Sequence, residues 1–195
     1  MTRTDIINFL IKKINANSYL EIGVREPIGN YNHINCKNKT AVDPYPLDSI
    51  VLPMTSDAFF YQNKSTFDII FIDGLHHADQ VEKDIANSLK VLNQGGYIIC
   101  HDMNPTTELM QIVPIQTNSE WTGDCWRAWV KVRSTNPNIS MEVVDTDFGV
   151  GIIQLGAQKL LKLNKESLTY EDFSSNKKEW LNLITVNQFY EKYKF

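Results

Sequence analysis

The sequence contains little cysteine and no long apolar run. Its three cysteines, Cys36, Cys100 and Cys125, are widely spaced and form no CxxC pair, so we expect no disulfide framework. No stretch approaches the roughly 20 apolar residues that a membrane span requires. Charged residues interrupt the N-terminal segment, where a signal peptide would have its apolar centre. We therefore predict a cytoplasmic protein with no membrane partner.

Basic charge is not in excess either. The chain has 19 Lys and Arg residues against 23 Asp and Glu residues, which gives a net charge of −4. Nucleic-acid-binding proteins usually carry a basic field, so we predict no nucleic-acid partner. The hydrophobic content of 43% excludes a disordered chain. With no repeat or linker to divide it, we expect one domain over residues 1–195, with an N-terminal helix (1–17), a core sheet (18–155) and a helical tail (156–195).

The order of short apolar runs and helical patterns predicts the fold class. Apolar runs predict strands over residues 18–24, 40–43, 67–72, 97–100, 139–144 and 149–155, with a further short strand at 50–52. Helical spacing predicts helices over residues 5–15, 56–62, 78–92 and 124–133, and two in the tail, at 177–184 and after a capping box of Thr185 and Gln188. Gly95 and Gly96 are expected to end the helix over 78–92. This alternation is typical of an α/β fold with a mostly parallel sheet.

In such sheets ligands bind at the carboxyl ends of the strands. The first strand ends in Glu21-Ile-Gly23, where a glycine lets the backbone approach a ligand but fits an ordinary turn as well. The GxGxxG fingerprint of dinucleotide sites is missing. Asp43 ends the second strand. Its carboxylate can accept hydrogen bonds from ribose hydroxyls, or it can start the turn before Pro44.

Two later strand ends carry the most informative residues. Asp73 and His76 follow the strand over 67–72, and His101, Asp102 and Asn104 follow the next one. If these strands are neighbours, about 4.8 Å apart, Asp73 and Asp102 lie side by side. With the Asn104 amide oxygen they form a corner of oxygen ligands that favours Mg²⁺, Mn²⁺ or Ca²⁺. His76 is then placed to act as a general base.

Other interpretations of the same residues remain open. Asp73 also fits a helix cap, and histidines after strands are often only solvated. The histidines and aspartates together also fit a zinc or iron site, which would make the protein a metal-dependent hydrolase or oxygenase. The segment from Trp121 to Trp129 fits the core face of a helix, or a wall of flat rings against a sugar.

Taken together, these motifs resemble the class I S-adenosylmethionine-dependent methyltransferases. The resemblance runs from about Ser18 to Leu155, and a strand ending in FIDGxH followed by a later His-Asp is similar to a small bacterial group related to metal-dependent sugar O-methyltransferases. It implies a Rossmann-like fold, a mostly parallel seven-stranded sheet whose last strand is antiparallel, and helices on both faces. Only 15 residues separate Val24 from Thr40, so the helix usual at that point should be short or missing.

The resemblance also implies roles for individual residues. The loop that begins at Glu21 and Gly23 would pass under the methionine part of S-adenosylmethionine, with Asp73 beside it. Asp43 would hold the ribose, and Ser56 and Asp57 would lie near the adenine. A divalent metal, Mg²⁺ in the simplest case, would be bound by Asp73 and Asp102, with His101 and Asn104 as further ligands.

The expected reaction is therefore O-methylation of a sugar or another small hydroxyl compound, with His76 and Asp73 as the catalytic residues. A non-catalytic domain that binds the cofactor is the second alternative, beside the hydrolase or oxygenase. The sequence identifies neither the acceptor nor the oligomeric state.

Overall fold

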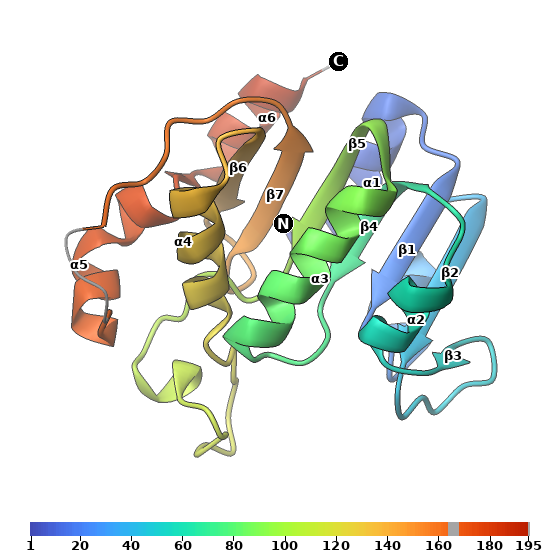
Figure 1. Cartoon of the computed structure of the whole chain (residues 1–195), viewed down its shortest axis with the longest axis horizontal. Helices are drawn as coiled ribbons and strands as arrows, with labels where there is room; N and C mark the ends of the chain where they lie inside the picture. Colours follow the sequence, from blue (N-terminus) through green and yellow to red (C-terminus); the bar gives the residue numbers. More distant parts are fainter. Residues whose placement is uncertain (164–167, 195) are drawn as a thin grey trace.

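The computed structural model, which describes residues 1–163 and 168–194, is an open α/β sheet with helices on both faces (Figure 1). The strand order is β3-β2-β1-β4-β5-β7-β6-β8, and β7 is antiparallel to both of its neighbours. The other pairings are parallel. The predicted Rossmann-like fold is thereby confirmed, with an eighth, two-residue strand added at the edge. The strands are β1 (Ser18–Ile22), β2 (Asn38–Asp43), β3 (Leu52–Pro53), β4 (Phe67–Ile72), β5 (Leu92–Cys100), β6 (Ile139–Val144), β7 (Val150–Leu155) and β8 (Leu183–Ile184).

The helices form two layers, each with its own apolar core. Helices α2, α3, α4 and α5 bury side chains in the core on one face, and α1 and α6 do so on the other. Because both faces are covered, the central strands are apolar almost throughout. The helices are α1 (Arg3–Ile14), α2 (Ser56–Gln62), α3 (Ala78–Val91), α4 (Cys125–Thr135), α5 (Tyr170–Trp180) and α6 (Val186–Tyr193), and short 3₁₀ turns span Pro27–Gly29, Tyr31–His33 and Leu109–Gln111.

Local capping explains where several helices begin. Thr2 and Asp5 form a capping box at the start of α1, and the predicted box of Thr185 and Gln188 is confirmed at the start of α6. Between β1 and β2 the chain forms only two 3₁₀ turns, as the short spacing predicted. In the described part of the chain, no helix has the length and apolar character needed to cross a bilayer.

Three predicted boundaries are wrong. Gly95 and Gly96 do not end α3, because α3 stops at Val91 and β5 starts at once, with both glycines inside the strand at a register shift against β4. The third strand is Leu52–Pro53 instead of 50–52.

The tail helix predicted over 177–184 also differs from the structure. It is Tyr170–Trp180, started by a capping box of Thr169 and Asp172. Leu183 and Ile184 pair with β6 as a strand instead. The pairing that makes them a strand comes from a segment some 40 residues away, so local pattern did not reveal it.

Candidate functional site

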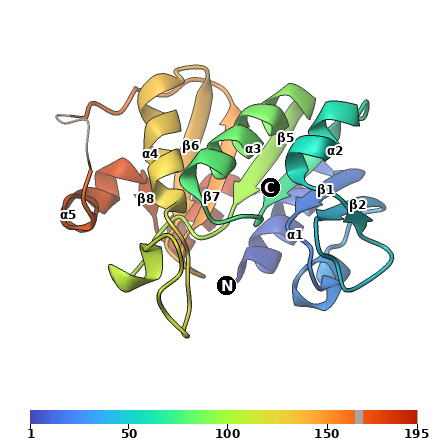
Figure 2. The same ribbon diagram turned by 60° about the horizontal axis from the view of Figure 1, so that its bottom comes forward.

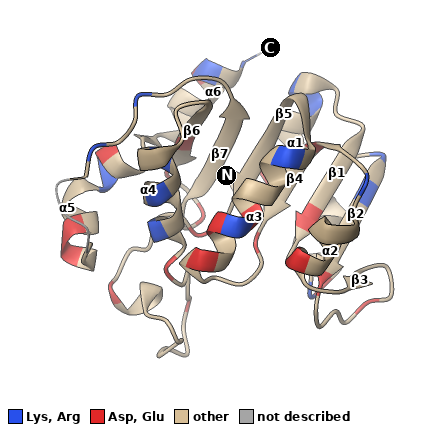
Figure 3. Ribbon diagram, viewed as in Figure 1, with Lys and Arg blue, Asp and Glu red and all other residues tan. Residues whose placement is uncertain are grey.

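The polar residues of interest gather at the carboxyl ends of the parallel strands. Figure 2 brings this edge of the sheet forward, and Figure 3 shows acidic residues on the loops there. Strands β4 and β5 are direct neighbours, with Ile72 opposite Cys100. Asp73 and His101 therefore leave the sheet side by side. The predicted adjacency of the two strand ends is confirmed.

A first cavity of about 560 Å³ opens beyond the ends of β1 and β2. Its lining includes four of the residues that the resemblance assigned to the cofactor: Gly23, Asp43, Ser56 and Asp57. One oxygen of the Asp43 carboxylate accepts a hydrogen bond from the Tyr45 backbone N–H at 2.7 Å. Asp43 thus starts the turn at Pro44 and also lines the cavity, so its position is compatible with both interpretations of this residue.

Gly23, the residue after β1, lies against the backbone of Asp73, the residue after β4, at the edge of the first cavity. Its φ is +97°, and a Cβ atom there would lie 2.0 Å from the backbone oxygen of Asp73. Only glycine fits without moving the loop that carries Asp73. Gly23 therefore fixes the position of Asp73 as well as lining the cavity.

Glu21 does not line the cavity, although it was predicted to contact the cofactor. Its side chain is 4% exposed and lies on the α1 side of the sheet. The Tyr19 hydroxyl and the Asn30 amide both donate hydrogen bonds to Oε2, and Asn30 in turn accepts one from Thr4 in α1. Burial raises the pKa of Glu21 to about 7. This carboxyl joins β1 to α1 beneath the cavity.

Glu21→Gln is expected to change how stability depends on pH. Because the pKa of Glu21 is raised in the folded protein, ionisation of Glu21 between about pH 4.5 and about pH 7 costs stability. The wild type should therefore lose up to about 3 kcal/mol of unfolding free energy relative to the variant as the pH rises through this range. Urea unfolding at about pH 5 and about pH 8 measures this. A difference between the two proteins that stays constant with pH would contradict the assignment.

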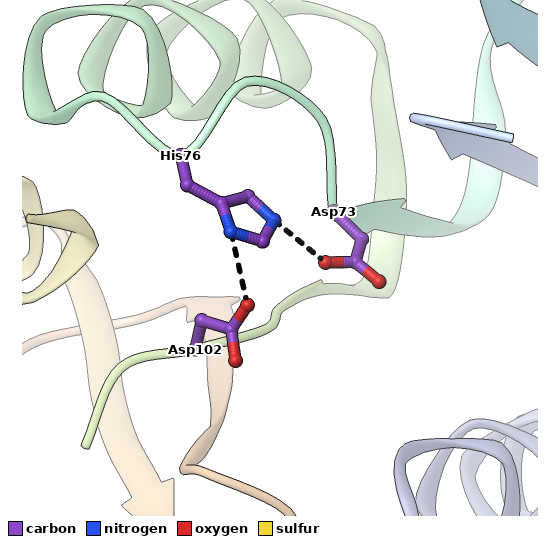
Figure 4. A group of neighbouring side chains, drawn as sticks. All are labelled: Asp73, His76 and Asp102. Carbon is purple, nitrogen blue, oxygen red and sulfur yellow. Dashed lines mark ion pairs between the residues drawn. The ribbon is translucent and has the colours of Figure 1, made fainter. Parts of the chain in front are cut away.

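A cluster of carboxylates and imidazoles lies next to the cavity, at the ends of β4 and β5. His76 Nε2 is 3.3 Å from Asp73 Oδ1, and His76 Nδ1 is 3.3 Å from Asp102 Oδ2 (Figure 4). One ligand atom from each of these three residues lies within 4.8 Å of the others. His101 Nδ1 is 3.3 Å from an oxygen of each carboxylate. Asp73, His76, His101 and Asp102 thus converge.

The carboxylates and imidazoles of this cluster stabilise one another in their charged forms. Burial opposes a charge on Asp73, but the facing imidazoles of His101 and His76 outweigh it and hold the pKa of this carboxyl well below its ordinary value. Burial would also lower the pKa of both histidines, yet the carboxylates raise the pKa of each above its usual value. The carboxylates of Asp73 and Asp102, with oxygen atoms within 4.8 Å of one another, are ligands that fit a divalent cation beside the His76 ring.

Sequence reasoning missed two members of the site, Arg3 and Asp147. Arg3 Nη1 is 3.2 Å from Asp147 and Arg3 Nε is 3.8 Å from Asp73, while Asp147 Oδ1 is 3.4 Å from His101 Nε2. Contact with His101, together with Arg3, holds the pKa of Asp147 well below its ordinary value. These residues are 144 positions apart and meet only because the fold places the start of α1 against the β6–β7 turn. No local signal marks them.

Asn104, predicted as a metal ligand, is turned away from the cluster. Its amide nitrogen donates to Asp145 at 2.9 Å, and its Oδ1 accepts from Lys177 at 3.4 Å. The cause is the backbone: Asp102 has a left-handed φ of +64°, and the chain then pairs with the β6–β7 turn through a hydrogen bond from Asn104 N to Phe148 O. A left-handed aspartate is strained, which is common at functional sites.

A second cavity of about 350 Å³ lies over this cluster. The Trp121 ring forms part of its lining and stacks on the His76 ring, with centroids 5.4 Å apart and planes 23° apart. Trp126 and Trp129, in contrast, are fully buried in the core. Each interpretation of the tryptophan segment therefore applies to part of it: Trp121 lines the wall of the second cavity, and Trp126 and Trp129 belong to the core. The full lining is Arg3, Asp73, His76, His101, Asp102, Glu120, Trp121, Thr122 and Phe148.

Comparison with known proteins gives a consistent result. Residues 35–103 match the model of a family described as a methyltransferase domain. This stretch contains β2, β3, α2, β4, α3 and β5, and with them most of the lining of the first cavity. Of the second cavity it contains Asp73, His76, His101 and Asp102. The comparison with curated proteins found no match.

Solved structures share the fold at low sequence identity. A putative O-methyltransferase from Klebsiella pneumoniae matches with a TM-score of 0.58 at 14% identity, covering 80% of each chain. The methyltransferase PaMTH1 from Podospora anserina, solved with S-adenosylhomocysteine, matches with a TM-score of 0.56 at 17% identity, covering 78% of this chain and 77% of its own. TomG from Streptomyces achromogenes, an O-methyltransferase of tomaymycin synthesis solved with S-adenosylmethionine, matches with a TM-score of 0.56 at 11% identity, covering 80% of each.

Proposed function

We propose that this chain is a class I S-adenosylmethionine-dependent methyltransferase and transfers the methyl group to a hydroxyl oxygen of a small acceptor molecule. One observation carries the proposal: the two cavities meet at consecutive residues, with Gly74 lining the first and Asp73 the second. A cofactor in the first cavity would present its sulfonium at this junction. An acceptor in the second would then lie in line with the methyl group.

The first cavity suits the cofactor in size and polarity. About 560 Å³ lies within the usual range for small-molecule sites, roughly 300–1,000 Å³. In the proposed arrangement, Asp43 accepts hydrogen bonds from the ribose hydroxyls, Ser56 and Asp57 lie at the adenine end, and Gly23 lies under the methionine part. Two solved structures with this fold contain S-adenosylhomocysteine or S-adenosylmethionine, which supports a cofactor of this class.

The chemistry requires one proton to leave the acceptor. The methyl group bonds to the acceptor oxygen as its bond to sulfur breaks, the hydroxyl proton passes to His76, and S-adenosylhomocysteine departs. His76 Nδ1 lies 3.3 Å from two acceptors, the Trp121 backbone oxygen and Asp102 Oδ2, whereas Nε2 faces one, Asp73 Oδ1. We therefore assign the hydrogen of the neutral ring to Nδ1, which leaves Nε2 as the basic atom.

A divalent cation is proposed to bind Asp73 and Asp102. Such a cation lowers the pKa of a nearby hydroxyl and so makes it a better nucleophile. Both carboxylates currently raise the pKa of His76. With a cation bound there, their charge would be compensated, and His76 would lose that interaction and be a competent base near neutral pH. His101, whose Nδ1 faces both carboxylates, would orient them or add a ligand.

We propose a sugar as the acceptor class. The flat Trp121 ring stacks on His76 at the wall of the second cavity, and aromatic rings commonly pack against sugar faces. A phenolic acceptor fits the same wall, so both classes belong in the test. We also propose that the chain acts as a single domain in the cytoplasm, where its free thiols would stay reduced.

The test is binding followed by turnover. Calorimetry should show that S-adenosylhomocysteine binds, and incubation with methyl-labelled S-adenosylmethionine, Mg²⁺ or Mn²⁺, and panels of sugars and phenols should transfer the label to a hydroxyl. Binding without transfer to any acceptor would favour a non-catalytic domain. Cation binding without S-adenosylhomocysteine binding would overturn the proposal in favour of a metal-dependent hydrolase or oxygenase.

Asp102→Asn is expected to weaken Mn²⁺ binding at least about tenfold, because an amide replaces a charged ligand. Asparagine tolerates the left-handed backbone of residue 102, so the loop should keep its shape. Calorimetric titration with Mn²⁺ measures the change. Asp79→Asn, which removes an exposed carboxylate from α3, is the matched control and should bind Mn²⁺ like the wild type. Equal affinity in all three proteins would exclude Asp102 as a ligand.

A further inference from the structure

A buried carboxylate outside the catalytic cluster lies behind the first cavity. Asp84 on α3 is 1% exposed, and one turn before it Gln80 reaches the cavity wall. The Gln80 amide nitrogen is 3.1 Å from Asp84 Oδ1, 3.2 Å from Ser56 Oγ and 3.2 Å from Asp57 Oδ1. Gln80 thus connects a buried charge to both residues at the start of α2.

The number of donors in this group limits which hydrogen bonds can form at the same time. The Gln80 amide has two hydrogens, yet three oxygens lie within hydrogen-bond distance of its nitrogen. The Ser56 hydroxyl also hydrogen-bonds the Asp84 carboxylate and lowers its pKa, so Ser56 donates to Asp84. With Asp84 ionised, one amide hydrogen of Gln80 goes to Asp84 and the other to Asp57. Every donor of the group is then used.

On the side chains of Gln80, Ser56 and Asp57, what remains for a ligand is therefore a set of acceptors. We propose that Asp84 is a positioning residue that, through Gln80 and Ser56, makes this end of the cavity accept hydrogen bonds and so selects a base with an amino group over one with an oxo group. The inference rests on the proposed function, in which the base of the cofactor lies at Ser56 and Asp57. An oxo group would face the lone pairs of these three side chains.

The charge on Asp84 should make this selection depend on pH. Asp84 is packed against α2, where the Asp57 charge disfavours its ionised form, and Lys83 on its own helix favours it. On β5, burial and then the charge of Asp84 raise the pKa of the Cys100 thiol, which stays neutral. Burial, the largest effect, raises the pKa of Asp84 to about 6. Below that pH Asp84 gains a hydrogen, and Gln80 and Ser56 lose the partner that orients them.

The experiment compares two ligands that differ only in the base. Calorimetry measures the affinity of S-adenosylhomocysteine and of S-inosylhomocysteine, which has an oxo group in place of the amine, for the wild type, Asp84→Asn and the exposed control Asp79→Asn. At about pH 7.5, the wild type and the control should prefer the amino base at least about tenfold, the value of one hydrogen bond. At about pH 5, the wild-type preference should shrink. Asp84→Asn should show the small preference at both pH values.

Two outcomes separate this inference from the proposed function. If the wild type binds neither ligand, the proposed function fails and this inference fails with it. If the wild type binds S-adenosylhomocysteine but Asp84→Asn keeps the same preference and pH profile, only the inference is overturned. Gln80→Leu, which leaves Asp84 in place and removes the donors at the cavity wall, should keep the preference for the amino base and lose most of its dependence on pH. It provides a second test should Asp84→Asn fail to fold, and a preference that still shrinks at about pH 5 in this variant would overturn the role of Gln80.

Discussion

His76→Ala should retain cofactor binding and lose turnover. Removal of a general base typically lowers the rate by about 10²–10⁴-fold. His76 lies between Asp73 and Asp102 and lines the second cavity but not the first, so the affinity for S-adenosylhomocysteine should stay close to that of the wild type. Labelled methyl transfer to the acceptor found in the panel measures kcat, and calorimetry measures binding.

The neighbouring histidine provides the control. His77 packs edge-on against Trp121, with ring centroids 6.4 Å apart, and lines neither cavity. His77→Ala should therefore keep most of the activity. If His76→Ala methylates the acceptor at the wild-type rate, or if both variants lose activity equally, His76 has no role as the base.

Gly23→Ala is expected to have the largest effect on the fold of the site. The new Cβ would fall 2.0 Å from the Asp73 backbone oxygen, and alanine strongly disfavours a φ of +97°. Strain and displacement of the β4 loop should cost about 2–4 kcal/mol of stability. Because Asp73 and Gly74 move with this loop, the affinity for both S-adenosylhomocysteine and the cation should fall more than about tenfold.

Gly29→Ala is the matched change, since no atom lies within 4 Å of a Cβ built at this position. Its stability should change by less than about 0.5 kcal/mol. Urea unfolding and calorimetry on both variants measure the contrast. Equal effects of the two substitutions would show that contact between β1 and β4 at Gly23 does not fix the site.

The sequence was most informative where local pattern and tertiary packing agree. The apolar run over Phe67–Ile72 predicted a strand covered on both faces, and β4 is such a strand at the middle of the sheet. Since the ends of parallel neighbours share an edge, this also predicted that Asp73 and Asp102 would lie side by side. Their convergence required only that β4 and β5 be adjacent, and they are.

Prediction failed where a distant partner decides the outcome. Arg3 reaches the site because the start of α1 contacts the β6–β7 turn. There the Arg3 backbone N–H donates a hydrogen bond to Asp147 at 2.8 Å. Glu21 lies in a strand whose side chains alternate between faces, and only the position of α1 shows that it is enclosed with Tyr19 and Thr4. Asn104 is turned away by a left-handed residue two positions earlier. Residue type and spacing do not encode these contacts.

The stacking of Trp121 on His76 has a practical consequence. The chain has four tryptophans, and the other three, Trp126, Trp129 and Trp180, are buried, so their emission forms a steady background. Trp121 alone has its ring at the wall of the second cavity, against the imidazole proposed to change its protonation. Arrival of a cation or an acceptor should therefore alter the intrinsic fluorescence of the unlabelled protein. Unknown acceptors can then be screened optically before any assay of their methylation exists.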